Sequence, residues 1–380
     1  MSENKIKFIK AFDRSIGSIV CQALGLFTTR SKKNLHTAIP EADLKNIKRI
    51  LVIRPGGIGD AILFYPLLHH LKKKFPRSEL HILAEKRNHG VLDANGIADR
   101  VYLYDSFLTA DLIKVMLSHY DLVIDTEQYH NLSAVVTFLT GAKFRCGFDT
   151  GPRGQLFTHR VPYNQQIYEV YSFLNLFSLL TGEEAIFDEN APFYPVEKQF
   201  LIWAKEQLKK FDSRKIAILC AGATVPERRW GAKKYSELAK WLISKDFNVV
   251  LIGAPGERAD SLEIEQGVAQ ERILNLVGKT SIPHAAAIVS LADIYVSSDT
   301  GILHVAYGVG TPTVHLFGPG ILEKWAPVGE KYIAITKNLP CSPCTTYGYT
   351  PDCPYNSKCV HMISVDDIKE AVMKILSMDQ

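Results

Sequence analysis

The segment from Ile50 to Phe75 constrains the fold most strongly, because it joins a strand pattern to a helix pattern through three glycines. Its first four residues are apolar and mostly β-branched, which is typical of a buried strand. After the glycine turn, large apolar residues recur every three or four positions, which predicts a helix with one buried face. A strand, a tight turn and a helix in this order present backbone N–H groups and the positive end of a helix dipole at a sheet edge.

The glycine turn does not match the dinucleotide-binding fingerprint. Gly57 and Gly59 are followed by Ile62 where the third glycine of G-x-G-x-x-G belongs. Both glycines remain candidates for a turn that contacts a phosphate group or an acceptor. Asp60 stands where the helix is predicted to begin, and it has two interpretations. It could cap the helix, or it could be a general base at the mouth of a crevice.

Composition excludes several classes of protein. A chain of 380 residues is long enough for two domains. Its 47% hydrophobic and 22% charged residues are typical of a soluble globular protein. The formal net charge of +4 is too small to indicate nucleic-acid binding. The sequence has no run of eighteen apolar residues, so no membrane-spanning helix is predicted.

The first thirty or so residues form a predicted amphipathic, basic helix. Its apolar positions recur at spacings of three and four, and basic residues surround them. The apolar positions are Ile9, Phe12, Ile16, Ile19, Ala23 and Leu26, and the basic ones are Lys5, Lys7, Lys10, Arg14, Arg30, Lys32 and Lys33. Such a helix could lie on an anionic membrane surface or pack on the protein. A signal peptide is not favoured, because charged residues interrupt the apolar segment and no cleavage site follows, so a reducing compartment is expected.

Two series of alternating strand and helix patterns follow, which predicts two parallel sheets with helices on both faces. Asp125 ends a strand of the first series and could face the same crevice as the glycine turn, or act as a local cap. Residues 143–154 are predicted to be turn and loop. The acidic, non-periodic stretch 181–195 is the predicted linker. The expected division is a lead-in with the basic helix (1–48), a first domain (49–190), a second domain (191–365) with a Cys-rich loop (341–359), and a C-terminal helix (366–380).

In the second series, Asp299, Thr300 and Gly301 stand between a predicted strand and a predicted helix. The N–H groups at such a helix start could bind a phosphate group, and His304 lies one turn later on the face of Thr300. Taken alone, however, Asp299 is also consistent with a helix cap and His304 with a buried core histidine.

Two further residues of the second series are candidates for binding a ligand, and a third belongs to a possible phosphate-binding motif. Arg228 could hold a diphosphate through its planar guanidinium, or form a surface charge pair. Glu257 follows a strand and could accept hydrogen bonds from a ribose or a base, or be a plain exposed carboxylate. Thr280 ends a Gly-Lys-Thr sequence, but the first glycine of a P-loop is replaced by Ile273, so that interpretation is rejected.

Four cysteines lie within nineteen residues near the end of the chain, at Cys341, Cys344, Cys353 and Cys359. Four thiols so close together could form a closed Zn²⁺ site or a redox pair. The second spacing departs from the two C-x-x-C knuckles of a zinc ribbon, so a metal-free loop is the other interpretation. The remaining three cysteines are scattered and are expected to be ordinary thiols.

In this order, the motifs resemble glycosyltransferase family 9, the heptosyltransferases of lipopolysaccharide core assembly. The resemblance rests on RPGGIGDAILFYPLLHHLKKKFP, AGATVPERRWGAKKY, LIGAPGE with GKTSI, VSSDTGILHVAYGVGTPTVHLFGP, and the CSPC segment ending in CVHMISVDDI. It implies a GT-B fold, in which two doubly wound Rossmann-like domains face each other across a cleft. The N-terminal domain would bind the acceptor and the C-terminal domain the nucleotide sugar. Family members are inverting transferases, commonly use ADP-heptose and require no catalytic metal or other cofactor.

The resemblance also implies roles for the residues that match the family motifs. Asp60 matches the base that takes a proton from the acceptor hydroxyl. Asp299 is expected at the donor sugar, with Thr300 and Gly301 offering N–H groups to the diphosphate and His304 close by.

The other donor-binding residues follow in the same way. Arg228 matches a basic position where some relatives have lysine, and the exchange keeps the charge but changes the geometry. Glu257 matches an acidic position associated with the nucleoside, and Thr280 lies in the stretch that contacts the base.

The expected partners are a nucleotide-sugar donor and a lipid-linked saccharide acceptor. The expected location is the cytoplasm, with the amphipathic helix as a candidate contact with the inner face of the cytoplasmic membrane. Two alternatives stay open. Another GT-B enzyme, such as an epimerase, would need a second acid or base in the donor pocket. A catalytically silent nucleotide-sugar-binding assembly protein would not need Asp60.

Overall fold

The computed structural model describes residues 13–28, 37–94, 96–104, 109–211, 214–346 and 348–378. The chain forms two compact units. The first unit contains the residues up to Gly57 together with Phe64–Phe187, and the second contains Ile58–Leu63 together with the residues from Asp188 onward. The sequence-based division places Ile58–Leu63 in the first domain, whereas their contacts assign them to the second unit.

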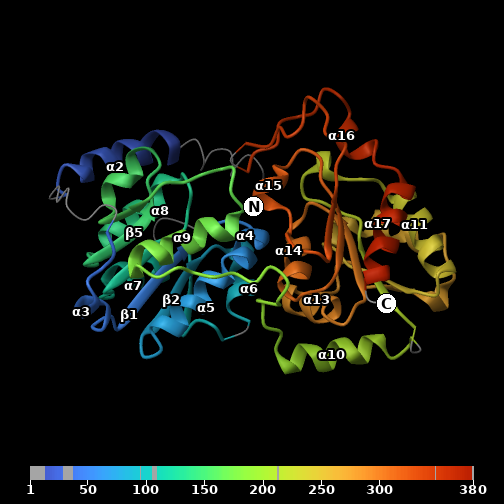
Figure 1. Ribbon diagram of the computed structural model, residues 1–380, viewed down its shortest axis with the longest axis horizontal. Coiled ribbons are helices and arrows are strands. Elements are labelled where there is room, and N and C mark those ends of the chain that lie inside the picture. Colours follow the sequence, from blue (N-terminus) through green and yellow to red (C-terminus); the bar gives the residue numbers. More distant parts are fainter. Residues whose placement is uncertain are drawn as a thin grey trace. The chain divides into compact units, whose positions relative to one another are not determined.

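The first unit is built on a six-stranded parallel sheet in the order β3-β2-β1-β4-β5-β6 (Figure 1). This is the strand order of a doubly wound Rossmann fold, which reverses direction between β1 and β4. The strands are β1 (Arg49–Arg54), β2 (Glu79–Ala84), β3 (Arg100–Leu103), β4 (Leu122–Asp125), β5 (Phe144–Phe148) and β6 (His159–Val161).

Helices precede, connect and follow these strands, and parallel pairing requires the connecting ones. They are η1 (Asp13–Gly17, one π-helical turn), α2 (Ser18–Gly25), α3 (Glu41–Leu44), α5 (Tyr65–Lys74), α6 (Lys86–Leu92), α7 (Ala110–Leu117), α8 (Asn131–Leu139), η2 (Gly151–Leu156) and α9 (Glu169–Thr181). Helices α7 and α8 cover one face of the sheet through a cluster that includes Leu51, Ile53 and Val123.

The second unit repeats this topology, with a six-stranded sheet in the order β12-β11-β10-β7-β8-β9. All of its strand pairs are parallel, and the order reverses between β7 and β10. The strands are β7 (Ile216–Cys220), β8 (Asn248–Leu251), β9 (Ile273–Asn275), β10 (Ile294–Ser298), β11 (Thr313–Leu316) and β12 (Tyr332–Ile335). Two doubly wound units of this kind are the components of a GT-B fold.

The helices of the second unit cover both faces of its sheet. They are α4 (Ile58–Leu63), α10 (Lys198–Leu208), η3 (Pro226–Arg228), α11 (Ala232–Ser244), η4 (Pro255–Glu257), α12 (Arg258–Gln266), η5 (Gln270–Arg272), α13 (Ile282–Val289), α14 (Gly301–Gly308), α15 (Leu322–Trp325), α16 (Lys358–His361) and α17 (Val365–Met378). None of the helices in the described ranges is both long and apolar enough to cross a bilayer.

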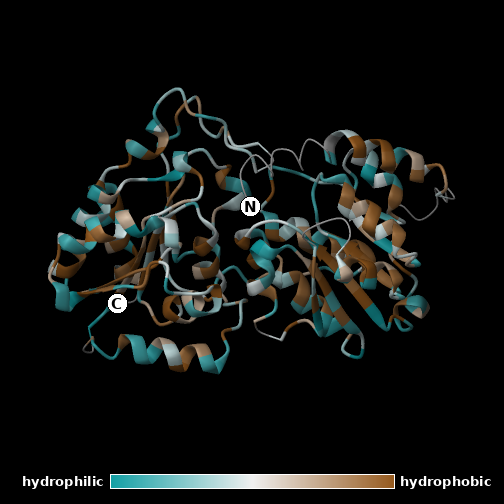
Figure 2. Ribbon diagram, turned by 180° about the vertical axis from the view of Figure 1, so that it is seen from behind, coloured by the Kyte–Doolittle hydropathy of each residue, from teal (hydrophilic) through white to brown (hydrophobic). Residues whose placement is uncertain are grey.

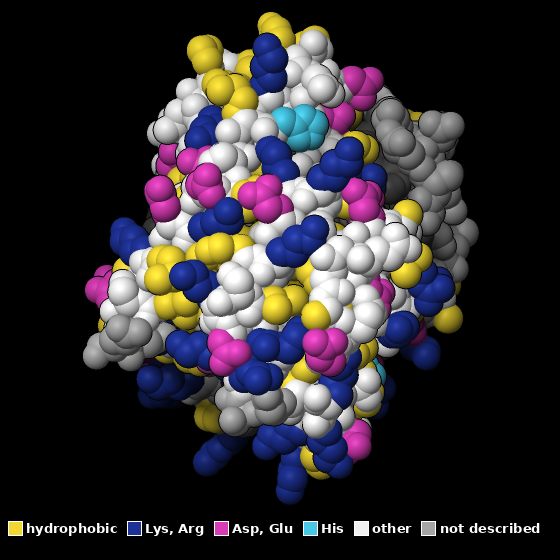
Figure 3. Space-filling view, turned by 90° about the vertical axis from the view of Figure 1, so that its right-hand side faces the viewer, with side chains coloured by type: hydrophobic (Ala, Val, Ile, Leu, Met, Phe, Trp, Pro, Cys, Tyr) yellow, Lys and Arg dark blue, Asp and Glu magenta, His cyan; other side chains and the backbone are white. Residues whose placement is uncertain are grey.

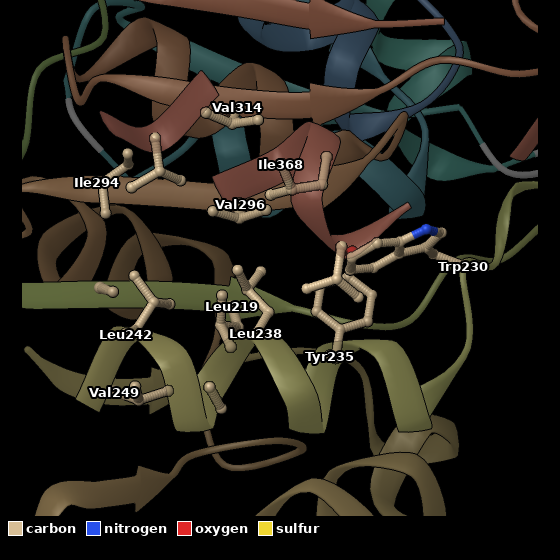
Figure 4. Packing of buried hydrophobic residues seen from close by; sticks show 14 of the residues in the cluster. Leu219, Trp230, Tyr235, Leu238, Leu242, Val249, Ile294, Val296, Val314 and Ile368 are labelled. Atoms are coloured by element: carbon tan, nitrogen blue, oxygen red, sulfur yellow. The ribbon is translucent and has the colours of Figure 1, made fainter. Parts of the chain in front are cut away.

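Side chains of the second sheet alternate between its two faces, and each face has its own hydrophobic core. Leu219 of β7 and Val296 of β10 pack against α11 and α17, which contribute Leu238 and Ile368 (Figure 4). The neighbouring strand residues, such as Tyr295, point to the opposite face and pack with α10, α13 and α14. Because successive side chains of a strand alternate between faces, each apolar strand is buried on both sides, as expected for a parallel sheet.

Two sequence-based predictions about the first unit are wrong. Residues 144–148 form β5, a sheet strand between β4 and β6, although the sequence Phe-Arg-Cys-Gly-Phe had predicted turn and loop. The single helix predicted after the glycine turn is two helices, with a break at Phe64. Pro66 explains the break, because proline cannot donate a backbone hydrogen bond and its ring clashes with the carbonyl four residues earlier.

Candidate active site

The predicted donor-binding residues gather where strand order reverses in the second unit. The carboxyl ends of β7 and β10 are neighbours, with Cys220 paired in register with Ser297. Ligands of doubly wound sheets bind outside the carboxyl ends of the strands at this position. The loop after β7 leads to Arg228, and the loop after β10 contains Asp299 and Thr300.

Arg228 and Asp299 form an ion pair at this sheet edge. Arg228 Nη1 lies 2.8 Å from Asp299 Oδ2 and donates a second bond of 3.3 Å to the Asp299 carbonyl oxygen. Arg228 Nε has no hydrogen-bond partner among the described residues. The buried Trp230 anchors the loop, because its indole N–H donates to the carbonyl of Ile363 at 2.8 Å. The guanidinium is therefore held in place by Asp299 and the anchored loop, and its side chain remains 20% exposed at the sheet edge.

Thr300 is the N-cap of α14, with its hydroxyl accepting a bond of 3.4 Å from Leu303 N. Gly301, the first residue of α14, approaches helix α4 closely. A Cβ on Gly301 would lie 2.9 Å from Ile58 Cβ, and a Cβ on Gly308 would lie 3.0 Å from a methyl group of Ile62. Glycine at both positions is therefore what allows α4 and α14 to pack together.

Helix α4 brings Asp60 next to this cluster. Gly59 is part of the helix, not of the turn before it, and a Cβ there would lie only 2.4 Å from His304 Cδ2. Because α4 begins at Ile58, Asp60 is its third residue; it lies in the first turn, near where the helix was predicted to begin, but not at the N-cap position. Gly57 remains in the turn, where the neighbouring Gly56 has a φ of 125° that favours glycine.

His304 is buried, and its Nδ1 has no hydrogen-bond partner among the described residues. Burial lowers its pKa, and the charge of Arg228 acts in the same direction, whereas Asp299 and Asp60 oppose the change. Since the net shift is downward, His304 is neutral near pH 7. The arrangement thus joins two carboxylates, one guanidinium and one neutral imidazole.

Glu257 and Thr280, the residues expected to bind the nucleoside, lie in loops at the same edge of the sheet, after β8 and β9. Glu257 Oε2 accepts a bond of 2.9 Å from Ala254 N, and the carboxyl packs so closely on Gly222 that a Cβ there would lie 1.8 Å from Glu257 Cδ. Burial raises the pKa of Glu257. Gly278 N donates to Gly253 O at 2.9 Å, which places the turn before Thr280 beside the turn before Glu257. Gly222 and Gly253 escaped the sequence analysis, because nothing local signals their packing.

Asp125 does not face a crevice. It is fully buried, with Oδ2 2.7 Å from Arg153 Nη2 and Oδ1 accepting from Glu127 N at 3.0 Å. Burial raises the pKa of Asp125, while Arg153 opposes that change. Glu127 is also buried, and Arg54 crosses the switch point to donate to Thr126 O at 2.9 Å. The carboxyl edge of the first sheet therefore contains a buried polar network that the sequence analysis missed.

The four late cysteines are free thiols. In the ranges that the structure describes, no three His, Cys, Asp or Glu side chains form a group that could hold a metal ion. The loop instead rests on the turn after β11: Cys344 N donates to Pro319 O at 3.0 Å, and a Cβ on Gly318 would lie 3.0 Å from Cys359 Sγ. A Cβ on the following Gly320 would lie 2.6 Å from Asp299 Oδ2, so this turn borders the ion pair.

Comparison with known proteins gives one family. The model of glycosyltransferase family 9 (heptosyltransferase) matches residues 110–353. Lipooligosaccharide heptosyltransferase 2 of Haemophilus influenzae is 25% identical over 304 residues, which cover 74% of this chain and 86% of the relative. Lipopolysaccharide heptosyltransferase 2 of Escherichia coli K12 is 24% identical over 317 residues, again covering 74% and 86%.

Solved structures with the same fold include two of this family. A family 9 glycosyltransferase of Veillonella parvula superposes with a TM-score of 0.72 at 19% identity, covering 87% of this chain and 97% of that one. The E. coli ADP-heptose lps heptosyltransferase II superposes with a TM-score of 0.67 at 21% identity, covering 87% and 100%. At these identities the likeness concerns the fold.

Proposed function

Because this chain belongs to glycosyltransferase family 9, the heptosyltransferases, we propose that it transfers a heptose or a related sugar from a nucleotide-activated donor to a lipopolysaccharide core-type acceptor, with inversion at the sugar. The proposed donor is ADP-heptose. The proposed acceptor is a lipid-linked saccharide bound by the first unit. An enzyme with such an acceptor would work at the inner face of the cytoplasmic membrane.

One observation carries the proposal: α4 packs against His304 at Gly59, the residue before Asp60, and Arg228 and Asp299 form their ion pair in the neighbouring loops of the same unit. Helix α4 contributes Asp60, and the two loops at the switch point of the second sheet contribute the others. A base, an anion-binding cation and a helix N-terminus in one place are the groups that glycosyl transfer to a hydroxyl requires.

The chemical step is a single displacement at the anomeric carbon. The acceptor oxygen forms a bond to that carbon as the bond to the diphosphate oxygen breaks, and the electron pair leaves with the nucleoside diphosphate. Asp60 takes the proton from the acceptor hydroxyl. Because the acceptor attacks from the side opposite the leaving group, the configuration inverts.

Arg228 and the N–H groups at the start of α14 are proposed to stabilise the negative charge that develops on the leaving diphosphate. Asp299 would contact the donor sugar while it orients Arg228 through their ion pair. Glu257 and Thr280 are proposed to bind the ribose and the base. No cofactor or metal is part of the proposal, since these groups supply the positive charge.

The test combines nucleotide titration with a transfer assay. ADP, UDP, GDP and CDP are titrated by calorimetry into the wild type, Asp60→Asn and Arg228→Ala, and transfer from ADP-heptose to core acceptors is measured. Asp60→Asn should lower turnover by about a hundredfold to ten-thousandfold and leave nucleotide affinity unchanged. Arg228→Ala should weaken ADP binding by about tenfold or more, because it removes charged hydrogen bonds to the diphosphate.

Asp366→Asn is the matched control, since Asp366 is also an aspartate in the first turn of a helix but lies at the start of α17. It should behave as the wild type in both assays. Normal turnover by Asp60→Asn would exclude the proposed base. Preference for another nucleotide would change the donor within the same family, and failure to bind any of the four would contradict the proposal.

A further inference from the structure

The helix before the first sheet is fixed to the first unit by one face. Helix α2 packs on α8 and η2 through small residues, since a Cβ on Gly17 would lie 3.0 Å from Asn131 Cβ and a Cβ on Gly25 only 2.5 Å from Gln155 Oε1. Cys21 is fully buried between these glycines, in a cluster that includes Phe157. This packing face was not apparent in the sequence, because it consists largely of small residues and not of the predicted apolar stripe.

Asp13 holds the start of the same segment. Its Oδ2 accepts from Asn131 N at 2.9 Å and lies 3.3 Å from His130 Nδ1, and its Oδ1 accepts from Leu132 N at 2.8 Å. The carboxylate therefore caps the N-terminus of α8 although it is more than a hundred residues away in the chain. Together with the glycine contacts, this cap gives the segment a single orientation.

The predicted apolar stripe faces away from this packing. Of the stripe, Ile16, Ile19 and Leu26 are 44%, 65% and 84% exposed, and Ile9 and Phe12 lie outside the described residues. Phe27, which follows the stripe, is 78% exposed. Apolar residues of α2 appear brown in Figure 2. Ile16 lies in η1, Ile19 in α2, and Leu26 and Phe27 in the turn that follows α2. Four large exposed apolar side chains on a segment that is already anchored by its other face are typical of an interaction site.

Charge distribution identifies the kind of partner. The first 36 residues contain seven basic and two acidic residues, while the rest of the chain is balanced, with 37 basic and 38 acidic residues. One of the two acids is Asp13, which is buried in the cap of α8. On the face shown in Figure 3, acidic and basic side chains mix over the upper part, whereas Lys and Arg predominate toward the lower edge. An exposed apolar helix face in a stretch of sequence with excess positive charge complements a surface that is apolar below and anionic above, which describes a bilayer with anionic lipids.

We propose that η1 and α2 form a membrane-docking element. Ile16, Ile19, Leu26 and Phe27 insert into the interface of a bilayer, and the positive charge that the sequence carries in its first 36 positions attracts anionic phospholipids to this element. Because Asp13 is bonded to the start of α8, directly after the loop that follows β4, docking fixes the orientation of the first unit on the membrane. The docking itself does not depend on the proposed function. Only its purpose, access to a lipid-linked acceptor, rests on that function.

The test measures sedimentation with lipid vesicles. The full chain is mixed with vesicles of phosphatidylglycerol and phosphatidylcholine, or of phosphatidylcholine alone. The wild type should bind the anionic vesicles at least about tenfold more tightly than the neutral ones, because each basic residue near the surface adds attraction, and binding should weaken as salt is added. Ile19→Glu/Phe27→Glu should lower the affinity for anionic vesicles by about tenfold or more.

Ile202→Glu on α10 and Leu262→Glu on α12 are matched controls, because both replace exposed aliphatic residues on other helices. They should bind vesicles as the wild type does. Unchanged binding by Ile19→Glu/Phe27→Glu, equal binding to both kinds of vesicle, or no binding by the wild type would overturn the proposal. So would a wild-type oligomer that dissociates in the double variant, since the face would then be a protein interface.

Transfer to a water-soluble, deacylated acceptor separates this proposal from the proposed function. The double variant should retain wild-type transfer to that acceptor and a wild-type circular dichroism spectrum, because the substituted side chains are exposed. A wild type that binds anionic vesicles but transfers no sugar would contradict the proposed function and leave the docking element supported.

Discussion

Glycine has a different role at Gly59 from the one that its motif suggested. The sequence predicted a turn that contacts a phosphate group or an acceptor, whereas the structure places Gly59 inside α4 with its Cα against the His304 ring. The residue type was therefore informative, but the reason for it was a contact with a helix more than two hundred residues later. Close packing without a side chain brings Asp60 next to His304.

Gly59→Ala should consequently destabilise the second unit and impair transfer. The added methyl group would overlap His304 Cδ2, so either the ring or α4 must move, at a cost of about 1–3 kcal/mol. Urea unfolding measures the change in stability, and the transfer assay measures the displacement of Asp60 through kcat.

Gly90→Ala provides the matched comparison, because Gly90 is also helical and its Cβ would meet no atom within 4 Å. This variant should be stabilised by about 0.5–1 kcal/mol and keep full activity. Equal effects of the two substitutions would contradict the packing role of Gly59.

At the scale of elements, the buried pair of Asp125 and Arg153 joins the end of β4 to η2. Arg153→Met should lower the free energy of unfolding by about 3–5 kcal/mol, because it leaves a buried carboxylate without its partner. Asp125→Asn/Arg153→Met should cost less than Arg153→Met alone, since the unpaired charge is gone. Urea unfolding of the three proteins measures the difference.

Lys143→Met is the control for this prediction. Lys143 pairs with Asp43 at the surface at 2.6 Å, and their side chains are 65% and 35% exposed. Loss of this ion pair should therefore change stability by less than about 1 kcal/mol. A double variant as unstable as Arg153→Met would show that the charge of Asp125 is not what destabilises the single variant.

The sequence predicted those elements whose signal is local. Strand β1 and helix α14 follow from apolar patterns within a few residues, and both are confirmed. Strand β5 was missed because an arginine and a glycine interrupt its short apolar pattern, and only its neighbours β4 and β6 make it a strand. The doubly wound order of the sheets followed from the alternation of strands and helices together with the family resemblance.

In the candidate site, too, some residue pairs could be predicted from sequence motifs and others could not. Motif order identified Arg228 and Asp299, which are 71 residues apart and prove to be ion-paired. Asp125 and Arg153 are 28 residues apart and belong to no shared motif, so their pairing could not be predicted. A buried pair depends on how the strands and loops pack, which local patterns do not encode.

At the scale of the whole molecule, each unit contains a buried histidine with a lowered pKa. Burial lowers the pKa of His159 in the first unit to about 4 and that of His315 in the second unit to about 3, from an ordinary value of 6.5. Both are therefore neutral when folded and bind protons more readily when unfolded. Their contribution to stability is complete above about pH 6.5 and is lost as pH falls toward those values.

His315→Phe should make the protein less sensitive to acid. Phenylalanine cannot be protonated, so between about pH 6.5 and pH 4.5 the free energy of unfolding should fall less steeply than in the wild type, by up to about 1.4 kcal/mol per pH unit. Urea unfolding across that range measures the slope. His119→Gln, at an exposed position, should leave the slope unchanged, and an unaltered slope in His315→Phe would contradict the assignment.

The assignment of α4 to the second unit also decides where this enzyme can be cut and recombined. A chimera that exchanged everything before Asp188 would introduce a foreign α4 beside the original α14. The glycines of that α14 pack closely against Ile58 and Ile62 of its own α4. The sequence before Asp188 is thus not a freely exchangeable module. A graft that keeps residues 58–63 with their own α14, and replaces only the sequence around them, respects the boundary that the packing defines.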